Sequence, residues 1–121
     1  RNLYPDYRPV VLSYTEALLK ANRPAEAKEL LKHYAKYNTP DLTYFNYLTR
    51  AEEESGNSVE AGIANAEYYY LSGETRVAIE RLRYILQQRD LQPDYYQEER
   101  IQARIALYQQ DLEIERVMLK K

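Results

Sequence analysis

Three similar segments decide the fold of this 121-residue chain: Asn22-Arg23-Pro24-Ala25-Glu26-Ala27, Gly56-Asn57-Ser58-Val59-Glu60-Ala61 and Gly73-Glu74-Thr75-Arg76-Val77-Ala78. The second segment follows the first after 34 residues, and the third follows the second after 17. Each begins with Asn or Gly, which readily adopt the left-handed conformation that ends a helix. Each also carries Ala at its sixth position, where two helices can cross closely. The segments therefore predict repeated helices joined by short turns.

A spacing of 34 residues is the period of tetratricopeptide repeats, and 17 is half of it. Because the third segment follows so soon, the helix over 58–72 has to serve as the second helix of one repeat and the first of the next. We therefore expect an all-α, TPR-like right-handed helical solenoid with about five short antiparallel helices and a longer C-terminal helix. The apolar spacing and helix-start signals (Thr39-Pro40, Ser58, and Asp94 with Gln97) place these helices at 8–21, 24–37, 40–55, 58–72, 75–89 and 94–118.

The chain is expected to form one domain, with TPR-like repeats over 1–93 and a C-terminal capping and extension helix over 94–121. Ile101, Ile105 and Tyr108 form an apolar stripe that can pack on the preceding helix as a cap. No later helix covers the apolar residues beyond this stripe, so we expect that end to fray or to meet another chain or domain. Those residues are Leu112, Ile114, Val117 and Leu119. Because the chain begins at Arg1 without an initiator Met, we interpret it as a piece of a longer protein.

Composition argues against several classes of function. The formal net charge is -2, whereas nucleic-acid and anionic-membrane binding normally need a basic field. The chain has no Cys, one His and three Gly, which argues against thiol catalysis, Cys/His zinc sites and glycine-rich phosphate loops. No apolar run is long enough to span a bilayer. We therefore predict no catalytic residue, no cofactor and no metal site in this chain.

Two groups of titratable residues could in principle hold a metal ion or transfer a proton. His33 lies beside Lys32 on the second predicted helix, and a lone imidazole without a second ligand has no metal geometry to satisfy. Glu52-Glu53-Glu54 has nothing apolar nearby to raise a carboxyl pKa for acid-base work. We expect both groups to be solvated.

Tyrosine is in excess, with 14 residues, and its ring and hydroxyl suit both helix seams and interfaces. Because Tyr68, Tyr69 and Tyr70 are consecutive and point about 100° apart, at least one of them should be exposed. In tetratricopeptide register, the residues expected to line a concave protein-binding groove are Leu12, Glu16, Leu19, Lys20, Asn46, Arg50, Glu53, Ile63, Glu67 and Tyr70. The alternative is that they are ordinary surface residues of the stack.

Several stretches look like one particular family. The segments Ala66-Glu67-Tyr68-Tyr69-Tyr70-Leu71-Ser72-Gly73-Glu74, Ala78-Ile79-Glu80-Arg81-Leu82 and Tyr95-Tyr96-Gln97-Glu98-Glu99-Arg100-Ile101-Gln102-Ala103-Arg104-Ile105 resemble the C-terminal TPR region of BepA-like periplasmic zinc metalloproteases, the β-barrel assembly-enhancing proteases. The resemblance implies a periplasmic module that follows a protease domain and helps assemble or degrade outer-membrane proteins. Its implied partners are proteins or peptides: the parent's own protease domain and the outer-membrane assembly proteins. The catalytic HExxH motif of that family is absent here, so no zinc ligand is carried over to any residue of this chain.

The sequence leaves three functions open. The first is a protein-protein interaction module, which the repeats, the balanced charge and the Tyr content favour. The second is a structural spacer or homo-oligomerisation domain that uses Leu112 to Leu119. The third, an enzyme with its active site in this chain, has the least support because the usual catalytic residue types are missing.

Overall fold

The structure, a computed structural model, describes residues 8–119 and is entirely helical over that range apart from the connecting turns. The predicted all-α fold is confirmed. Residues 1–7 of the predicted repeat region and residues 120–121 of the predicted terminal helix lie outside the described residues. The helices are α1 (Arg8–Lys20), α2 (Pro24–Ala35), α3 (Leu42–Glu54), α4 (Ser58–Leu71), α5 (Thr75–Gln87) and α6 (Tyr95–Leu119).

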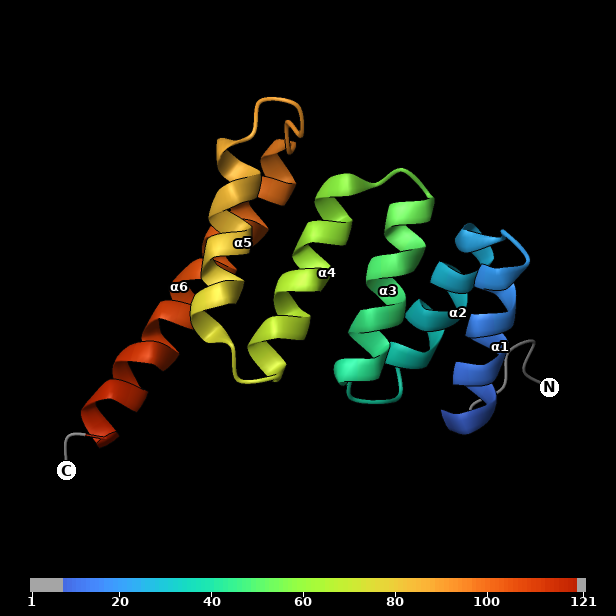
Figure 1. Ribbon diagram of the computed structural model, residues 1–121, viewed down its shortest axis with the longest axis horizontal. Coiled ribbons are helices and arrows are strands. Elements are labelled where there is room, and N and C mark those ends of the chain that lie inside the picture. The colour runs from blue at the N-terminus through green and yellow to red at the C-terminus, as the bar shows by residue number, and fades with distance from the viewer. Residues whose placement is uncertain (1–7, 120–121) are drawn as a thin grey trace.

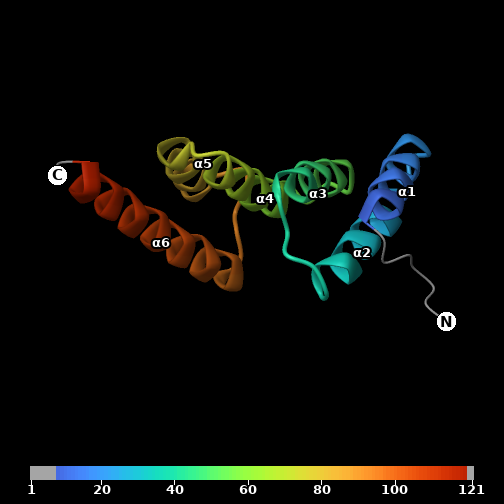
Figure 2. The ribbon, with the colours of Figure 1, turned by 90° about the horizontal axis from the view of Figure 1, so that it is seen from below.

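The helices form a single stack in which each helix packs on the next one along the chain (Figure 1). Successive helices run in opposite directions, and α6 also contacts α4, to which it is roughly parallel. Seen from below, α2 and α6 lie on the same side of α3 and α4 (Figure 2). This arrangement is a helical solenoid; its assignment to the tetratricopeptide type stays a prediction.

Left-handed residues end three of the helices, as the repeated segments predict. Asn22, Gly56 and Gly73 have φ values of 61°, 81° and 89°. At each of these turns the next residue's N–H donates to the carbonyl five residues earlier, for example Arg23 N to Leu18 O at 2.9 Å. Each turn thus satisfies carbonyl groups that the helix end leaves unpaired.

The helix starts agree with the predictions except at α3. Asp94 and Gln97 form the predicted capping box: Gln97 N–H donates to Asp94 Oδ1 at 2.7 Å, and Asp94 N–H donates to Gln97 Oε1 at 3.0 Å. Pro24 occupies the first turn of α2. The predicted start of α3 at Thr39-Pro40 is wrong, because Asp41 is the N-cap and accepts from Tyr44 N–H at 3.0 Å. Helix α4 begins at Ser58, as predicted, although Asn57 and not Ser58 is its N-cap.

The buried apolar side chains form two clusters, one in each half of the stack. The N-terminal core comprises Val11, Leu18, Leu19, Ala27, Leu30, Leu31, Tyr34, Tyr44 and Ala51, from α1 to α3. The C-terminal core comprises Val59, Ile63, Ala66, Ala78, Ile79, Leu82, Ile85, Ile101, Ile105 and Tyr108, from α4 to α6. Consequently, α3 and α4 are the helices at which the two cores adjoin.

Small residues lie where the helices approach closely. Ala27, Ala61 and Ala78 are all buried, as the repeated segments predict. At Gly62 in α4, an added Cβ would lie only 2.7 Å from Ile85 Cδ1 in α5. A larger residue at this crossing would require the Ile85 side chain to move.

Helix α6 packs against the stack as far as Leu112, and its last turns do not. Ile101, Ile105 and Tyr108 are buried against the stack, while Ile114, Val117 and Leu119 are 52%, 47% and 81% exposed. The helix continues past α5 and projects from the stack (Figure 1). Within residues 8–119, the prediction that no helix covers these apolar residues is confirmed for Ile114, Val117 and Leu119. It is wrong for Leu112, which is half-buried and packs against the C-terminal core.

Candidate binding groove

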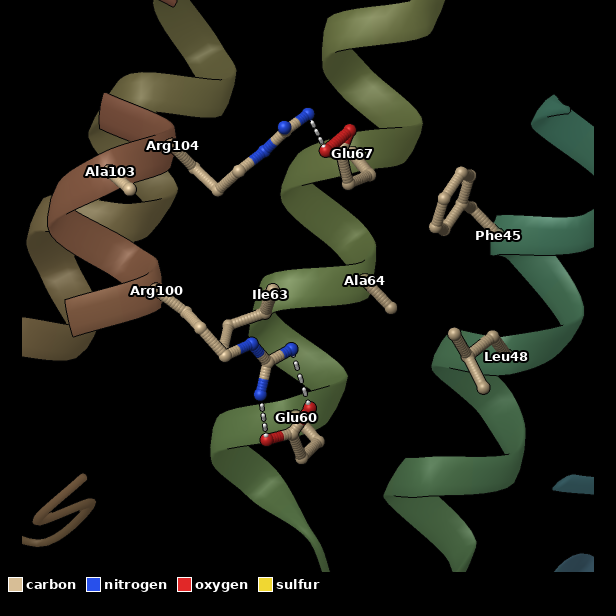
Figure 3. Close-up of a pocket in the computed structure, with 9 residues that line it drawn as sticks. All are labelled: Phe45, Leu48, Glu60, Ile63, Ala64, Glu67, Arg100, Ala103 and Arg104. Carbon is tan, nitrogen blue, oxygen red and sulfur yellow. Dashed lines mark hydrogen bonds and ion pairs between the residues drawn. The ribbon is translucent and has the colours of Figure 1, made fainter. Parts of the chain in front are cut away.

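An open cavity of about 360 Å³ lies between α3, α4 and α6. We call it the central groove. Figure 3 shows α4 along its floor, with α3 on one side and α6 on the other. The groove is lined by Phe45, Leu48, Glu60, Ile63, Ala64, Glu67, Arg100, Ala103 and Arg104.

The floor of the groove is apolar because of helical spacing. Ile63 and Ala64 lie on the same face of α4 as Glu60 and Glu67, which stand three or four residues away along the helix. Phe45 and Leu48 of α3, three residues apart, complete the floor and pack against the N-terminal core. The floor therefore spans the junction of the two cores.

The α6 side of the groove is closed by two ion pairs to α4. Arg100 Nη1 and Nη2 donate to the two carboxylate oxygens of Glu60 at 2.7 and 3.1 Å, and Gln97 Nε2 donates to Glu60 at 3.0 Å. Arg104, one turn further along α6, pairs with Glu67, seven residues beyond Glu60 (Figure 3). A two-pronged Arg-carboxylate contact fixes direction as well as distance, so the pairs hold α6 in register with α4.

Burial alone would raise the pKa of the Glu60 carboxyl group. The hydrogen bonds from Arg100 and Gln97 and the charge of Arg100 outweigh that effect, and the pKa is lowered. The same contact raises the pKa of Arg100. Lys32 of α2 also lies near enough to contribute to the lower pKa of Glu60. The carboxylate therefore remains ionised near neutral pH and acts as an ion-pair partner.

A tyrosine pair continues the contact between α4 and α6 beyond the groove. The rings of Tyr70 and Tyr108 stack with centroids 4.4 Å apart, and the Tyr70 hydroxyl donates to Asp111. Arg104 lies over the Tyr108 ring, 5.2 Å from its centroid. Burial, and then the charge of Glu67, raise the pKa of the fully buried Tyr108. Tyr108 is thus a neutral part of the core.

The structure places only two of the ten predicted groove residues, Ile63 and Glu67, in the central groove. Leu19 is buried in the N-terminal core, and Leu12 is half-buried. Tyr70 packs against α6, where it contacts Tyr108 and Asp111. On α1, Lys20 lies 3.8 Å from Glu16 in an exposed ion pair.

The three predicted groove residues of α3 lie elsewhere. Asn46 is exposed, and Arg50 lies over the Tyr47 ring at 5.7 Å. Glu53 lines a second cavity of about 240 Å³, whose lining residues on α4 include Ala61 and Asn65.

The predicted groove is therefore not one surface. Residues of α4 turn about 100° per position, so Ala61 and Asn65 face away from Ile63 and Glu67. The prediction assumed that the first helix of every repeat turns the same face towards one concave side of the stack. Here α4 lies between α3 and α5, and two different faces of α4 line two different cavities.

Sequence reasoning missed most of the residues that line the groove: Phe45, Leu48, Glu60, Ala64, Arg100, Ala103 and Arg104. One signal was available, since Arg100 and Arg104 are one turn apart and Glu60 and Glu67 are two turns apart on single helix faces. Pairing them requires knowing that α6 contacts α4 as well as α5.

Two expectations about titratable groups are corrected, as is one about the tyrosines. Glu52 is 5% exposed rather than solvated: it lies 3.5 Å from Lys28 of α2 and accepts from Asn57 Nδ2 at 2.8 Å. His33 is half-buried, with its ring edge-on to Tyr37. Each of Tyr68, Tyr69 and Tyr70 is half-buried, so the expectation of an exposed one is wrong.

Within residues 8–119, no three His, Asp or Glu side chains come together as a metal site. Over the same range, no helix has the length and apolar character needed to cross a membrane. Comparison of the chain with protein-family models, with curated proteins and with solved structures found no match.

Proposed function

We propose that this chain is a protein-protein interaction module that binds a helix or peptide of a partner protein in the central groove. The observation that carries the proposal is an open apolar floor bounded on one side by two fixed ion pairs. Apolar side chains of a partner would gain from leaving water on this floor. The guanidinium groups of Arg100 and Arg104 and the carboxylates of Glu60 and Glu67 are held at the edge of this floor. They can there orient polar groups of the partner.

The composition of the groove supports a protein partner. Interfaces are enriched in aromatic residues and Arg, and the groove and its rim contain Phe45, Arg100 and Arg104. Because the two arginines are already bound by Glu60 and Glu67, they are fixed before a partner arrives. Fixed side chains lose less conformational entropy on binding.

The family resemblance supplies the expected partners and compartment. The stretch that resembles BepA-like proteases over Tyr95 to Ile105 includes Arg100, Ala103 and Arg104, which line the groove. We therefore propose that the module works in the periplasm. Its partners would be the protease domain of its own polypeptide or proteins that assemble the outer membrane.

Site-specific photo-crosslinking in the periplasm tests this proposal. A photoreactive residue at Ala103, which lines the groove, is expected to give adducts with the protease domain or an outer-membrane assembly protein. The same residue at Ala17, an exposed position of α1, serves as the matched control and should give none. Leu48→Glu should reduce the Ala103 adducts, because it places a charge on the apolar floor. Equal adducts at both positions, or none at Ala103, would contradict the proposal.

A second candidate function, homo-oligomerisation, is favoured by one specific observation. The exposed second half of α6 carries Ile114, Val117, Met118 and Leu119 with no neighbouring helix in the described chain to cover them. Exposed apolar residues grouped on one element commonly mark an interaction site.

A further inference from the structure

We propose that two copies of this chain form an antiparallel dimer in which each copy lays the second half of its α6 along the central groove of the other. This inference rests on the proposed role of the groove as a binding site, and it names one occupant: a second copy. Three features of the structure carry it, namely the path of α6, the continuity of one α6 face, and the charges at its two ends.

The second half of α6 cannot occupy the groove of its own chain. Helix α6 is continuous from Tyr95 to Leu119, and its C-terminal end projects from the stack (Figures 1 and 2). Leu112 is its last residue packed against the C-terminal core. Its first half already forms one side of the groove. Any burial of the exposed second half in a groove must therefore involve another molecule.

The face of α6 that borders the groove continues into the exposed half. Arg100, Ala103, Leu107, Gln110, Ile114 and Val117 follow one another at alternating steps of three and four residues. Such spacing keeps side chains on one face of a helix and is typical of helices that pair along their length. Leu107, Ile114 and Val117 on this face are 37%, 52% and 47% exposed.

An antiparallel arrangement makes this face complementary to itself. If two α6 helices cross about a point between Tyr108 and Gln109, Ile114 of one copy meets Ala103 of the other. Val117 then meets Arg100, and Leu107 meets Gln110. The large exposed Ile is thus placed opposite the small Ala that leaves room at the groove. A two-fold axis repeats the contact and closes the assembly at two copies.

The pairing also brings opposite charges together. It places Glu113 of one copy opposite Arg104 of the other, whereas a parallel pair would place the two Glu113 side chains opposite each other. Both residues already have partners within the chain, Arg116 and Glu67, so this contact adds to existing ion pairs.

Sedimentation of the whole chain over a range of concentrations tests the dimer. We expect the mass to rise with concentration towards twice the 14.4 kDa of one chain. Ile114→Glu and Ala103→Glu should each weaken association at least tenfold. Val10→Glu and Ala17→Glu make similar changes at exposed positions of α1 and should leave it unchanged. Helix content measured by circular dichroism checks that every variant is folded.

Two further measurements distinguish this dimer from association through a different surface. The double variant Ala103→Lys with Ile114→Glu should recover association, because the predicted pairing places the new Lys opposite the new Glu. A labelled wild-type peptide of residues 107–119 should bind the full chain that carries Ile114→Glu. It should bind at least tenfold more weakly to a full chain that carries both Ile114→Glu and Ala103→Glu. A chain that is monomeric at every concentration, or a dimer insensitive to Ile114→Glu and Ala103→Glu, overturns the inference, as does failure of the double variant to recover association.

The outcome is independent of the proposed partner binding. Photo-crosslinking at position 103 in the Ile114→Glu chain reports on other proteins when the second copy no longer competes. If the chain is monomeric and these adducts persist, the dimer is wrong and the interaction module stands. If the dimer forms and no other protein is captured, the dimer stands and the proposed interaction module is wrong.

Discussion

Glu60 illustrates how a single residue acquires its role from distant parts of the chain. In the sequence it is the fifth residue of the second repeated segment, where nothing distinguishes it from Glu26 in the first. In the structure Glu26 makes an exposed local ion pair with Arg23, three residues away. Glu60 instead binds Arg100, forty residues away. The long-range pair orders two helices relative to each other, whereas the local pair orders only a turn.

The lowered pKa of Glu60 predicts a specific pH dependence of stability. Because its pKa lies below the ordinary value of 4.5, the folded chain binds fewer protons at this group than the unfolded chain does. Its stabilising contribution is therefore present above about pH 5 and is lost as the pH falls through the folded-state pKa. We expect Glu60→Gln to lower the free energy of unfolding by about 1 kcal/mol at pH 7.

Urea unfolding of the wild-type and Glu60→Gln chains between pH 7 and pH 3 measures this effect. The difference between them should shrink towards zero at low pH. Glu29→Gln, on an exposed position of α2, is the control and should differ little from wild type throughout. A difference that stays constant down to pH 3 contradicts the assignment.

Ala78 tests the close helix crossing that the repeated segments predict. The residue is fully buried in the C-terminal core, so Ala78→Leu should overpack it and destabilise the chain by about 1 to 3 kcal/mol. Ala17→Leu makes the same change at an exposed helical position and should alter stability by less than about 0.5 kcal/mol. Thermal melting of the two variants distinguishes these outcomes. If both melt with the parent, position 78 does not lie at a tight crossing.

At the scale of the helix, α6 has a well-defined start and an uncovered end. Its first turn is fixed by the Asp94 and Gln97 capping box, and its first half by Ile101, Ile105 and Tyr108. Glu113 and Arg116 make only a local, exposed ion pair near its end. The start of the helix is therefore held by the stack, whereas its last turns are exposed.

Asp94→Ala removes one half of the capping box and should cost about 1 kcal/mol of stability. The physical reason is that the Gln97 N–H loses its side-chain acceptor at the first turn of α6. Asp90→Ala, in the loop just before α6, is the matched control, because Asp90 is also exposed. In chemical unfolding, the Asp94→Ala chain should have a lower free energy of unfolding than the Asp90→Ala chain. Equal stability of the two variants would mean that the cap contributes nothing measurable.

At the scale of the whole molecule, the stack has two cores rather than one. Each core is formed by three consecutive helices, and they adjoin at α3 and α4. Repeat proteins of this kind gain stability from contacts between neighbours, so one end can open without the other. The central groove lies at this junction, where a partner would contact both halves.

Hydrogen exchange should show this division. Leu30→Ala in the N-terminal core and Leu82→Ala in the C-terminal core each remove a fully buried side chain and should cost about 2 to 5 kcal/mol. Leu30→Ala should lower amide protection more in α1 and α2 than in α5, and Leu82→Ala should do the opposite. Uniform loss of protection in either variant would show that the two halves unfold as one.

The sequence by itself determined the helices, their order and most of their ends. Local signals suffice for these features: left-handed Asn and Gly at the turns, small Ala at the crossings, and the capping box before α6. The start of α3 was misplaced because Thr39-Pro40 and Asp41 both look like helix starts, and only the Asp41 contact with Tyr44 N–H distinguishes them.

Tertiary structure alone decided where the cavities lie and which charges pair. The predicted groove assumed that all repeats present one regular concave face. In the structure two different faces of α4 line two different cavities. Glu67 lines the central groove and Glu53 lines the other cavity, so the two residues do not share a surface. Glu52 looked solvated because three consecutive acids resemble an exposed face, yet Lys28 of another helix covers it. Helical periodicity fixes which residues share one face of one helix. Which faces meet depends on packing between residues that are as many as 41 positions apart, as in the contact of Tyr70 with Asp111, and no local pattern encodes that contact.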